Sequence, residues 1–301
     1  MPTLPPSVEH WRNRGDFVDA CGMRVFVVDT GPASATDVVL VLHGFPTSSH
    51  DWHRALPQMG DPARRRFILF DMPGYGLSDK PAEYSYSLME QADVAEWVLR
   101  QVGVSRAHIV AHDMGTSVAC ELMARRERRL LSFQTRSLLL MNGSVHIELA
   151  HLTPSQRLLQ SPLKNTFARL GSGTVFKAQL RRICGQPLSD EDLEAMWAQI
   201  LHLDGKLRLP RIIEYLGERR RFWHRWIGAL TRLSELPTHV LWGPLDRVAV
   251  PAIATQLARE IPDTELEWLE GLGHYPMLED PDRTGAAVRR WLDRAGAAAH
   301  S

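Results

Sequence analysis

The 301-residue sequence predicts an α/β protein built on a mostly parallel central sheet with helices on both of its faces. Three observations support this prediction. Short apolar segments rich in branched residues alternate with longer segments of helical periodicity. Several of the apolar segments run directly into turn residues such as Gly, Pro and Asn. The alternation stops between about residues 144 and 230, which predicts a helical insertion between two successive strands.

The predicted strands and helices alternate along the rest of the chain. We expect strands at Arg24–Asp29, Val38–Leu42, Phe67–Asp71, His108–His112, Ser137–Met141, His239–Trp242 and Glu265–Leu269. We expect helices at Ser87–Val102, Thr116–Arg126, Ala252–Glu260 and Pro281–Ala295. These elements divide the chain into a first core segment (1–143), a helical cap (144–230) and a second core segment (231–301).

The composition limits the kind of partner. Lys plus Arg number 35 and Asp plus Glu number 35, so there is no basic excess and nucleic acid is not the expected partner. Basic runs at Arg125–Arg129 and Arg219–Arg221 are interpreted as solvated helix faces. The three cysteines (Cys21, Cys120 and Cys184) are far apart and lack C-x-x-C spacing, so we expect neither a disulfide framework nor a metal site.

The sequence also predicts where the protein works. Met1–Pro6 lacks the charged-then-apolar layout of a signal peptide. No apolar run approaches the roughly 18–20 residues that a membrane span requires. We therefore expect a cytoplasmic protein without a membrane span, and the sequence leaves the oligomeric state open.

One predicted strand end carries a candidate nucleophile, Asp113. In an open parallel sheet, ligands bind beyond the carboxyl ends of the strands. Ile109–Thr116 runs from an apolar strand through a tight turn into a helix, which is the layout of a G-x-S-x-G nucleophile elbow. Asp113 takes the serine position and Gly115 the last glycine, whereas Ala111 replaces the first glycine. The segment alone fits equally well an Asp113 that only caps the following helix.

The turn after the strand Val38–Leu42 supplies a candidate oxyanion hole. Its sequence, His43-Gly44-Phe45-Pro46, resembles the turn that provides one oxyanion donor, here the amide of Phe45. The amide of Met114, directly after the nucleophile, would be the second donor. An ordinary strand-ending turn would explain the glycine and the proline, but not their coincidence with the elbow.

Two late strand ends supply the remaining members of a catalytic triad. Leu241–Asp246 and Leu269–His274 each follow a predicted strand and each end in a residue that a triad needs. The order nucleophile, acid, histidine is the order that this architecture uses. A lone histidine near a carboxyl terminus is more often a packed or surface residue, but the complete set in this order favours catalysis.

Together these motifs resemble the α/β-hydrolase superfamily, in its branch with an aspartate nucleophile and a helical cap. That branch includes epoxide hydrolases and haloalkane dehalogenases. The segments His43–Ser49, Gly74–Pro81, Tyr215–Leu230 and His274–Pro281 also resemble the mesoderm-specific transcript protein group. The resemblance extends from about residue 16 to residue 291 and implies an α/β-hydrolase fold with an inserted cap.

An aspartate nucleophile implies a two-step reaction without a cofactor. An aspartate is anionic at neutral pH and attacks without a base. Attack on a saturated carbon gives an alkyl ester that must then be hydrolysed. His274, oriented by Asp246, would take a proton from the attacking water. The amides of Phe45 and Met114 would stabilise the oxyanion formed on Asp113.

The leaving group can be an epoxide oxygen or a halide. An epoxide oxygen needs a proton, and enzymes of that branch commonly use two cap tyrosines; the insertion has only Tyr215, which could equally be a packed aromatic. A halide needs N–H donors, and many dehalogenases have Trp at the position of Met114. Other candidate donors, all types more often found in a core, are Trp52, Trp197, Trp223, His224 and Trp226.

These considerations define the expected substrate. We expect His43, Trp52 and Tyr215 to contact it. A small hydrophobic substrate is favoured by four apolar residues near the predicted site, which are Phe45, Met114, Leu245 and Met277. Epoxide hydrolysis is the first expectation and carbon–halogen hydrolysis the second. A small-molecule receptor on a hydrolase fold is a third, because a fold alone does not establish activity.

Overall fold

The computed structural model describes residues 3–298. The first two residues of the expected first core segment, which also begin Met1–Pro6, and the last three of the second core segment lie outside the described residues. One eight-stranded sheet forms its centre, in the order β1-β2-β4-β3-β5-β6-β7-β8. The strands are β1 (Asp16–Ala20), β2 (Met23–Thr30), β3 (Asp37–Leu42), β4 (Arg65–Phe70), β5 (Arg106–His112), β6 (Gln134–Met141), β7 (Thr238–Trp242) and β8 (Glu265–Trp268). The pairs β1–β2 and β2–β4 are antiparallel and all the others are parallel.

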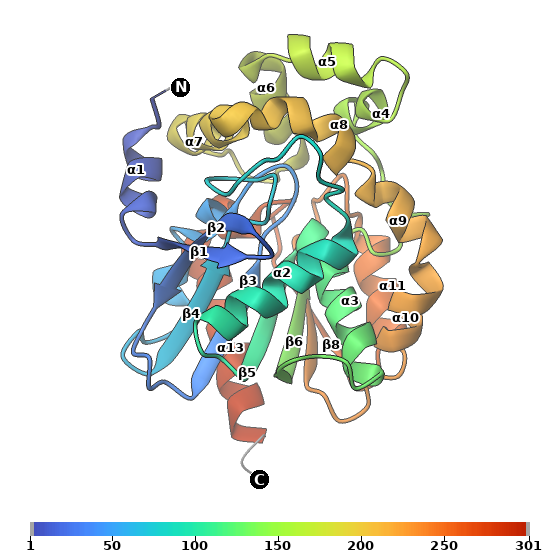
Figure 1. The fold of residues 1–301 in the computed structure, drawn as a ribbon. Coiled ribbons are helices and arrows are strands. Elements are labelled where there is room, and N and C mark those ends of the chain that lie inside the picture. Colours follow the sequence, from blue (N-terminus) through green and yellow to red (C-terminus); the bar gives the residue numbers. More distant parts are fainter. Residues whose placement is uncertain (1–2, 299–301) are drawn as a thin grey trace.

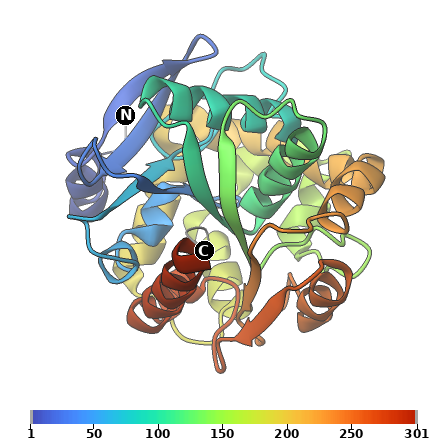
Figure 2. The ribbon, with the colours of Figure 1, turned by 90° about the horizontal axis from the view of Figure 1, so that it is seen from below.

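Helices cover both faces of this sheet (Figure 2). Helices α2, α3 and α11 lie on one side, and α13 lies on the other (Figures 1 and 2). The helices outside the insertion are α1 (Pro6–Arg12), α2 (Leu88–Gln101), α3 (Met114–Glu127), α11 (Pro251–Glu260), α12 (Pro276–Glu279) and α13 (Pro281–Ala298), with the short 3-10 helices η1 (Ser49–Trp52) and η2 (Leu56–Gln58). Within residues 3–298, no helix combines the length and apolar character that crossing a membrane would demand.

The predicted fold class is confirmed. Every expected strand and helix is present, with ends shifted by a few residues. Outside the insertion, the unexpected elements are helix α1, the edge strand β1 and three short helices, η1, η2 and α12. Strand β1 forms a hairpin with β2 across Cys21 and Gly22, whose φ angles are 56° and 76°. Positive φ at both residues of a two-residue loop is the geometry that matches the twist of a hairpin.

The segment between β6 and β7 contains helices and no strand (Figure 1). Helices α4 to α8 lie over the carboxyl ends of the strands, while α9 and α10 descend along α3 (Figure 1). Their bounds are α4 (Pro154–Leu159), α5 (Lys164–Leu170), α6 (Gly173–Ile183), α7 (Asp190–Leu201), η3 (His202–Arg208), α8 (Leu209–Ile212), α9 (Tyr215–Arg221) and α10 (Trp223–Leu230). The carboxyl ends of the parallel strands, where ligands bind in such sheets, therefore lie beneath this helical insertion.

Candidate active site

Asp113 lies in a sharp turn between β5 and α3. Its backbone has φ 46° and ψ −111°, a strained conformation for a residue with a side chain. The side chain makes no capping hydrogen bond to α3, so the helix-cap alternative does not describe it. Instead, Oδ2 accepts a hydrogen bond of 2.8 Å from the amide of Phe45. The side chain is buried, at 3% exposure.

Two glycines allow the surrounding backbone to approach Asp113. A Cβ at Gly44 would lie 2.7 Å from Cβ and 3.0 Å from Oδ2 of Asp113. A Cβ at Gly115 would lie 2.6 Å from the carbonyl oxygen of Leu42 and 2.7 Å from that of His43. The shortest distance at each glycine is below any real Cβ contact, so only glycine allows the turn after β3 and the start of α3 to pack at this separation.

The structure places both expected oxyanion donors beside Asp113. The amide of Phe45 already donates to the carboxylate. Met114 is the first residue of α3, and its amide has no acceptor among residues 3–298, as expected for the first turn of a helix. Its side chain accepts a hydrogen bond of 2.9 Å at Sδ from the hydroxyl of Tyr75. The Phe45 amide therefore binds the carboxyl group, while the Met114 amide, next in the chain after Asp113, remains without an acceptor among residues 3–298.

The structure also brings together the predicted acid and histidine. His274 Nδ1 donates to Asp246 Oδ2 at 2.7 Å, and both side chains are buried. Asp246 Oδ1 accepts from the amides of Val248 and Ala249 at 2.7 and 3.0 Å. This carboxylate is thus held in place by its own loop while it orients the imidazole, which is the arrangement that a triad needs.

The charges around His274 make it more basic. Burial alone would lower the pKa of this imidazole, but the carboxylates of Asp246 and Asp113 raise it to about 9. His274 is therefore protonated at neutral pH while Asp113 is charged. Because the charge of Asp113 contributes to the raised pKa, neutralisation of Asp113 in an ester would lower the pKa of His274 and favour its action as a base.

Two further residues support His274 and were not singled out from the sequence. Asn142, at the end of β6, donates from Nδ2 to Asp246 Oδ2 at 2.8 Å and accepts from the amide of Gly243 at 3.0 Å. Its φ of 45° is the conformation that Asn tolerates better than most residues. His112 Nε2 lies 2.7 Å from the carbonyl oxygen of His274. Burial and the neighbouring His274 lower the pKa of His112 to about 3, so it is neutral.

The interpretation of Arg219–Arg221 as a solvated helix face is wrong for its first residue. Arg219 is 1% exposed, whereas Arg220 and Arg221 are exposed. Its Nε donates to Ser117 Oγ at 2.8 Å, and Nη2 lies 4.0 Å from Asp113 Oδ1. The insertion therefore places a buried cation beside the candidate nucleophile. Helix α9 turns this position inward, four residues after the buried Tyr215.

Tyr215 is buried in the same region. Its ring centroid lies 5.5 Å from that of Phe45, and its hydroxyl has no hydrogen-bond partner among residues 3–298. Burial and the charge of Asp113 raise the pKa of Tyr215, whereas the charge of Arg219 lowers it. The Tyr215 side chain is therefore close enough to Asp113 to respond to its charge. Its hydroxyl lies near Gln156 and Arg219, which also lower its pKa, but makes no hydrogen bond of normal geometry within residues 3–298.

The other two residues expected to contact the substrate, His43 and Trp52, are both buried in the core. Both His43 nitrogens are engaged by the backbone: Nδ1 lies 2.9 Å from the carbonyl oxygen of Gly44, and Nε2 accepts from the amide of Met72 at 2.9 Å. Trp52 is fully buried in the core layer that contains Trp11 and does not line the cavity described below. In residues 3–298, no group of three or more His, Cys, Asp or Glu side chains is arranged to hold a metal.

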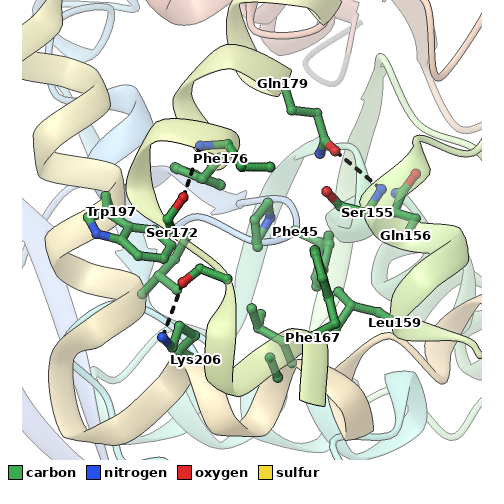
Figure 3. A pocket seen from close by; sticks show the side chains of 16 residues that line it. Phe45, Ser155, Gln156, Leu159, Phe167, Ser172, Phe176, Gln179, Trp197 and Lys206 are labelled. Atoms are coloured by element: carbon green, nitrogen blue, oxygen red, sulfur yellow. Dashed lines mark hydrogen bonds between the residues drawn. The ribbon is translucent and has the colours of Figure 1, made fainter. Parts of the chain in front are cut away.

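An apolar cavity lies inside the insertion, above Phe45 (Figure 3). Its volume is about 60 Å³, and it is partly open to solvent. Most of its wall consists of apolar side chains from the turn after β3 and from helices α4 to α8. These are Phe45, Leu159, Phe167, Val175, Phe176, Trp197, Ile200 and Leu209. Gln156, Gln179, Ser155 and Ser172 add polar groups (Figure 3). Since Phe45 lines the cavity with its ring and binds Asp113 with its amide, the cavity and the triad meet at this residue.

A family model of the alpha/beta hydrolase fold matches residues 37–281, which is most of the chain. The chain belongs to the α/β-hydrolase family. Over 92% of its length it is 39% identical to a Mycobacterium tuberculosis protein named "Putative hydrolase LipZ", of which it covers 94%. It is 35% identical to the human mesoderm-specific transcript homolog protein, over 93% of this chain and 86% of that protein.

Solved α/β hydrolases share the whole architecture. A haloalkane dehalogenase of Bradyrhizobium elkanii, in a loop variant, superimposes with a TM-score of 0.80 at 23% identity, covering 95% of this chain and 98% of that one. A thermophilic esterase of Thermogutta terrifontis gives a TM-score of 0.71 at 22% identity, with 93% and 97% covered. At these identities the likeness shows the fold, and membership of the family makes this chain a hydrolase.

Proposed function

We propose that this hydrolase opens a hydrophobic epoxide through a covalent ester on Asp113. The observation that carries the proposal is the hydroxyl of Tyr215, which is buried, lacks a hydrogen-bond partner within residues 3–298 and is close enough to sense the charge of Asp113. A buried polar group without a partner is costly in a folded protein, and such groups often await a ligand. An epoxide oxygen would supply the missing partner.

In the first step, Asp113 Oδ1 attacks a ring carbon and forms a C–O bond. The bond between that carbon and the epoxide oxygen breaks, and the oxygen takes the proton of Tyr215. Oδ2 remains hydrogen-bonded to the amide of Phe45 at 2.8 Å, which leaves Oδ1 as the attacking atom. No base is required, because the carboxylate is already charged.

In the second step, water attacks the ester carbonyl of Asp113 and gives a proton to His274. The negative charge develops on Oδ2, where the amides of Phe45 and Met114 would hold it. The alcohol leaves as a diol after it has been protonated by His274. The proton of the regenerated carboxylic acid returns to the Tyr215 phenolate. His274, which releases a proton to solvent when the ester forms, takes one up again when Asp113 regains its charge, and the starting state is restored.

The cavity inside the insertion is the proposed site for the apolar part of the substrate. Its wall is mostly apolar and reaches Phe45. Of the other apolar residues expected near the site, Leu245 is 49% exposed and Met277 is fully buried, and neither lines the cavity. In this proposal residues 144–230 act as the cap that keeps water from the ester until His274 can use it.

Carbon–halogen hydrolysis by the same three residues is the second candidate. The observation that favours it is the indole of Trp197 on the cavity wall. Trp226 Nε1 donates to Glu121 at 2.9 Å, and Trp223 is 46% exposed and packs on His224, so these are poorly placed as halide donors. The solved dehalogenases with this architecture make the test worthwhile.

A paired assay separates these functions. The purified protein is incubated with a styrene-oxide-type substrate and, separately, with a bromoalkane, and the release of diol and of bromide is measured. The proposal predicts diol formation that Asp113→Asn abolishes, unless its amide is hydrolysed back. Bromide release without diol would replace it with the second candidate. A ligand that stabilises wild type and Asp113→Ala equally, with no turnover on either substrate, would instead indicate a binding protein.

A further inference from the structure

Arg219 is a buried cation that has no role in the proposed reaction steps. Its guanidinium is enclosed between α9 and the first turn of α3: Nε donates to Ser117 Oγ at 2.8 Å, and Nη2 donates to the main-chain oxygen of Asp113 at 3.3 Å. At 1% exposure, this charge is almost completely removed from water. Burying an arginine costs free energy unless a counter-charge is near.

The only counter-charge of Arg219 in the described residues is the candidate nucleophile. Nη2 lies 4.0 Å from Asp113 Oδ1, and Arg219 forms no other ion pair within residues 3–298. By contrast, Arg225 in α10 and Arg232 just after α10 each pair with a glutamate of α3. Arg219 therefore depends on a charge that disappears when Asp113 becomes an ester.

Arg219 also stacks on Tyr215. The guanidinium carbon lies 4.7 Å from the centroid of the phenol ring, within the range of a cation–π contact. The hydroxyl of this ring has no partner in residues 3–298. One buried side chain thus contacts both the nucleophile and the residue proposed to protonate the leaving oxygen.

Ester formation reverses the balance of charge at Tyr215. The charged and titratable groups that face it are Asp113, Arg219 and Tyr75. Burial and the Asp113 carboxylate raise the pKa of Tyr215, and Arg219 lowers it. When the carboxylate becomes a neutral ester, it no longer raises the pKa of Tyr215, whereas Arg219 still lowers it. Loss of the phenol proton then gives Arg219 a new counter-charge in place of the old one.

We propose that Arg219 is a positioning residue that stabilises the Tyr215 phenolate once Asp113 is esterified, so that attack on the epoxide and protonation of its oxygen are coupled. This inference rests on the function proposed above. The bond from Oδ1 to carbon forms, the carbon–oxygen bond of the epoxide breaks, and the Tyr215 proton passes to that oxygen. The negative charge moves from Asp113 to Tyr215, and Arg219 neutralises it at both stages.

The test is a double-mutant cycle between Arg219 and Tyr215, made in a His274→Gln background so that ester formation alone is observed. The rate of adduct formation with styrene oxide is followed by intact-protein mass spectrometry. Arg219→Met should slow it about 100-fold, in line with the loss of general acid catalysis. In a protein that already carries Tyr215→Phe, the same substitution should cost less than about 3-fold. Arg219→Lys, which keeps the charge, should recover part of the rate.

Arg220→Met is the matched control, since Arg220 is the exposed neighbour on the same helix, and its rate should not change. Equal losses from Arg219→Met with and without the Tyr215 hydroxyl would overturn the inference, because a merely structural arginine acts in both backgrounds. If Arg219→Met does not fold, the cycle is made with Ser117→Ala, whose loss must likewise depend on Tyr215. No adduct in the His274→Gln parent would instead refute the proposed function itself.

Discussion

The chemistry of the site depends on a few side chains whose charges are coupled. Asp113 and His274 lie at the ends of β5 and β8, far apart in sequence, yet the charge of one changes the pKa of the other. His274 is protonated while Asp113 is ionised, and it must be neutral to accept a proton from water. The coupled charges of Asp113 and His274 therefore predict how each step responds to pH.

Hydrolysis of the ester should be lost at low pH. Below the pKa of His274 in the ester state, the imidazole is protonated and cannot accept a proton. That pKa lies below the value of about 9 found when Asp113 is charged. Rapid-quench mass spectrometry with an epoxide should show the ester fraction rising as pH falls. Asp246→Asn should move this transition to lower pH, because it removes the carboxylate that contributes most to the raised pKa; an unchanged transition would contradict the account.

Gly44→Ala should reduce turnover without unfolding the protein. The added Cβ would lie 2.7 Å from Asp113 Cβ, so the turn after β3 must move and take the Phe45 amide with it. Loss of one oxyanion donor typically slows a reaction about 10²–10³-fold, and we expect kcat to fall by that order. Gly217→Ala is the control, since a Cβ there meets no atom within 4 Å. Full activity in Gly44→Ala would show that the close approach is not needed.

The proposed triad residues could be picked out of the sequence because each stands in a local pattern at a strand end, and the proposed oxyanion residues because a glycine turn lies beside them. Arg219 could not be predicted. It belongs to a run of three arginines, and in such a run the sequence does not show which one the helix turns inward. Asn142 likewise follows β6 in an ordinary Asn-Gly turn, and its role depends on the distant Asp246. Contacts made only in three dimensions leave no local signal.

At the scale of elements, one carboxylate ties the loop of His274 to the insertion. Glu279, at the end of α12, accepts from the amides of Gly185 and Gln186 at 2.8 and 2.9 Å, just after α6. It also accepts from the amides of Gly273 and Tyr275, which flank His274, at 2.7 and 2.9 Å. The same side chain thus fixes a catalytic loop and one end of the insertion.

Glu279→Gln should therefore lower both stability and activity. An amide nitrogen cannot accept these hydrogen bonds, and bonds to a charged acceptor contribute about 1.5–3 kcal/mol each. We expect the melting temperature to fall by at least about 5 °C and kcat by about 10-fold. Glu270→Gln, in the same loop but exposed, is the control. A variant with wild-type kcat would show that His274 is positioned without this link.

The elements themselves could be predicted to different degrees. Central strands were found because burial on both faces makes them continuous apolar runs, as in β4. The edge strand β1 was missed because its sequence, Asp-Phe-Val-Asp-Ala, neither alternates nor forms an apolar run, and most of it is only partly buried. The helices of the insertion were predicted as a group without bounds, since most are short and a helix of one or two turns shows little periodicity in the sequence.

At the scale of the whole molecule, helix α3 joins the insertion to the sheet. It begins after Asp113 and carries Glu121, which accepts from Arg225 at 2.6 and 2.7 Å, from Trp226 at 2.9 Å and from Arg125 at 3.0 Å. Burial alone would raise the pKa of Glu121, but these donors lower it below its ordinary value of 4.5. One buried carboxylate therefore holds α10 against the helix that starts after Asp113, the proposed nucleophile.

Glu121→Gln should destabilise the protein by about 3 kcal/mol at neutral pH, because it leaves the partly buried Arg225 without its counter-charge and weakens its charged hydrogen bonds. Since the folded pKa is lowered, this stabilisation is present above pH 4.5 and is lost as pH falls through the folded pKa. Denaturant unfolding should show the difference from wild type shrinking below pH 4.5. The exposed pair of Glu127 and Arg232 provides a control, and Glu127→Gln should unfold like wild type. A pH-independent difference would exclude charge as the cause.

The most direct test of the central claim is the intact mass of His274→Gln after mixing with an epoxide that wild type converts. The account predicts a stable increase equal to the mass of the epoxide, which peptide mapping places on Asp113. Such an adduct should be absent from Asp113→Asn carrying the same histidine substitution. An unmodified His274→Gln protein, or an adduct on another residue, would contradict a covalent Asp113 intermediate.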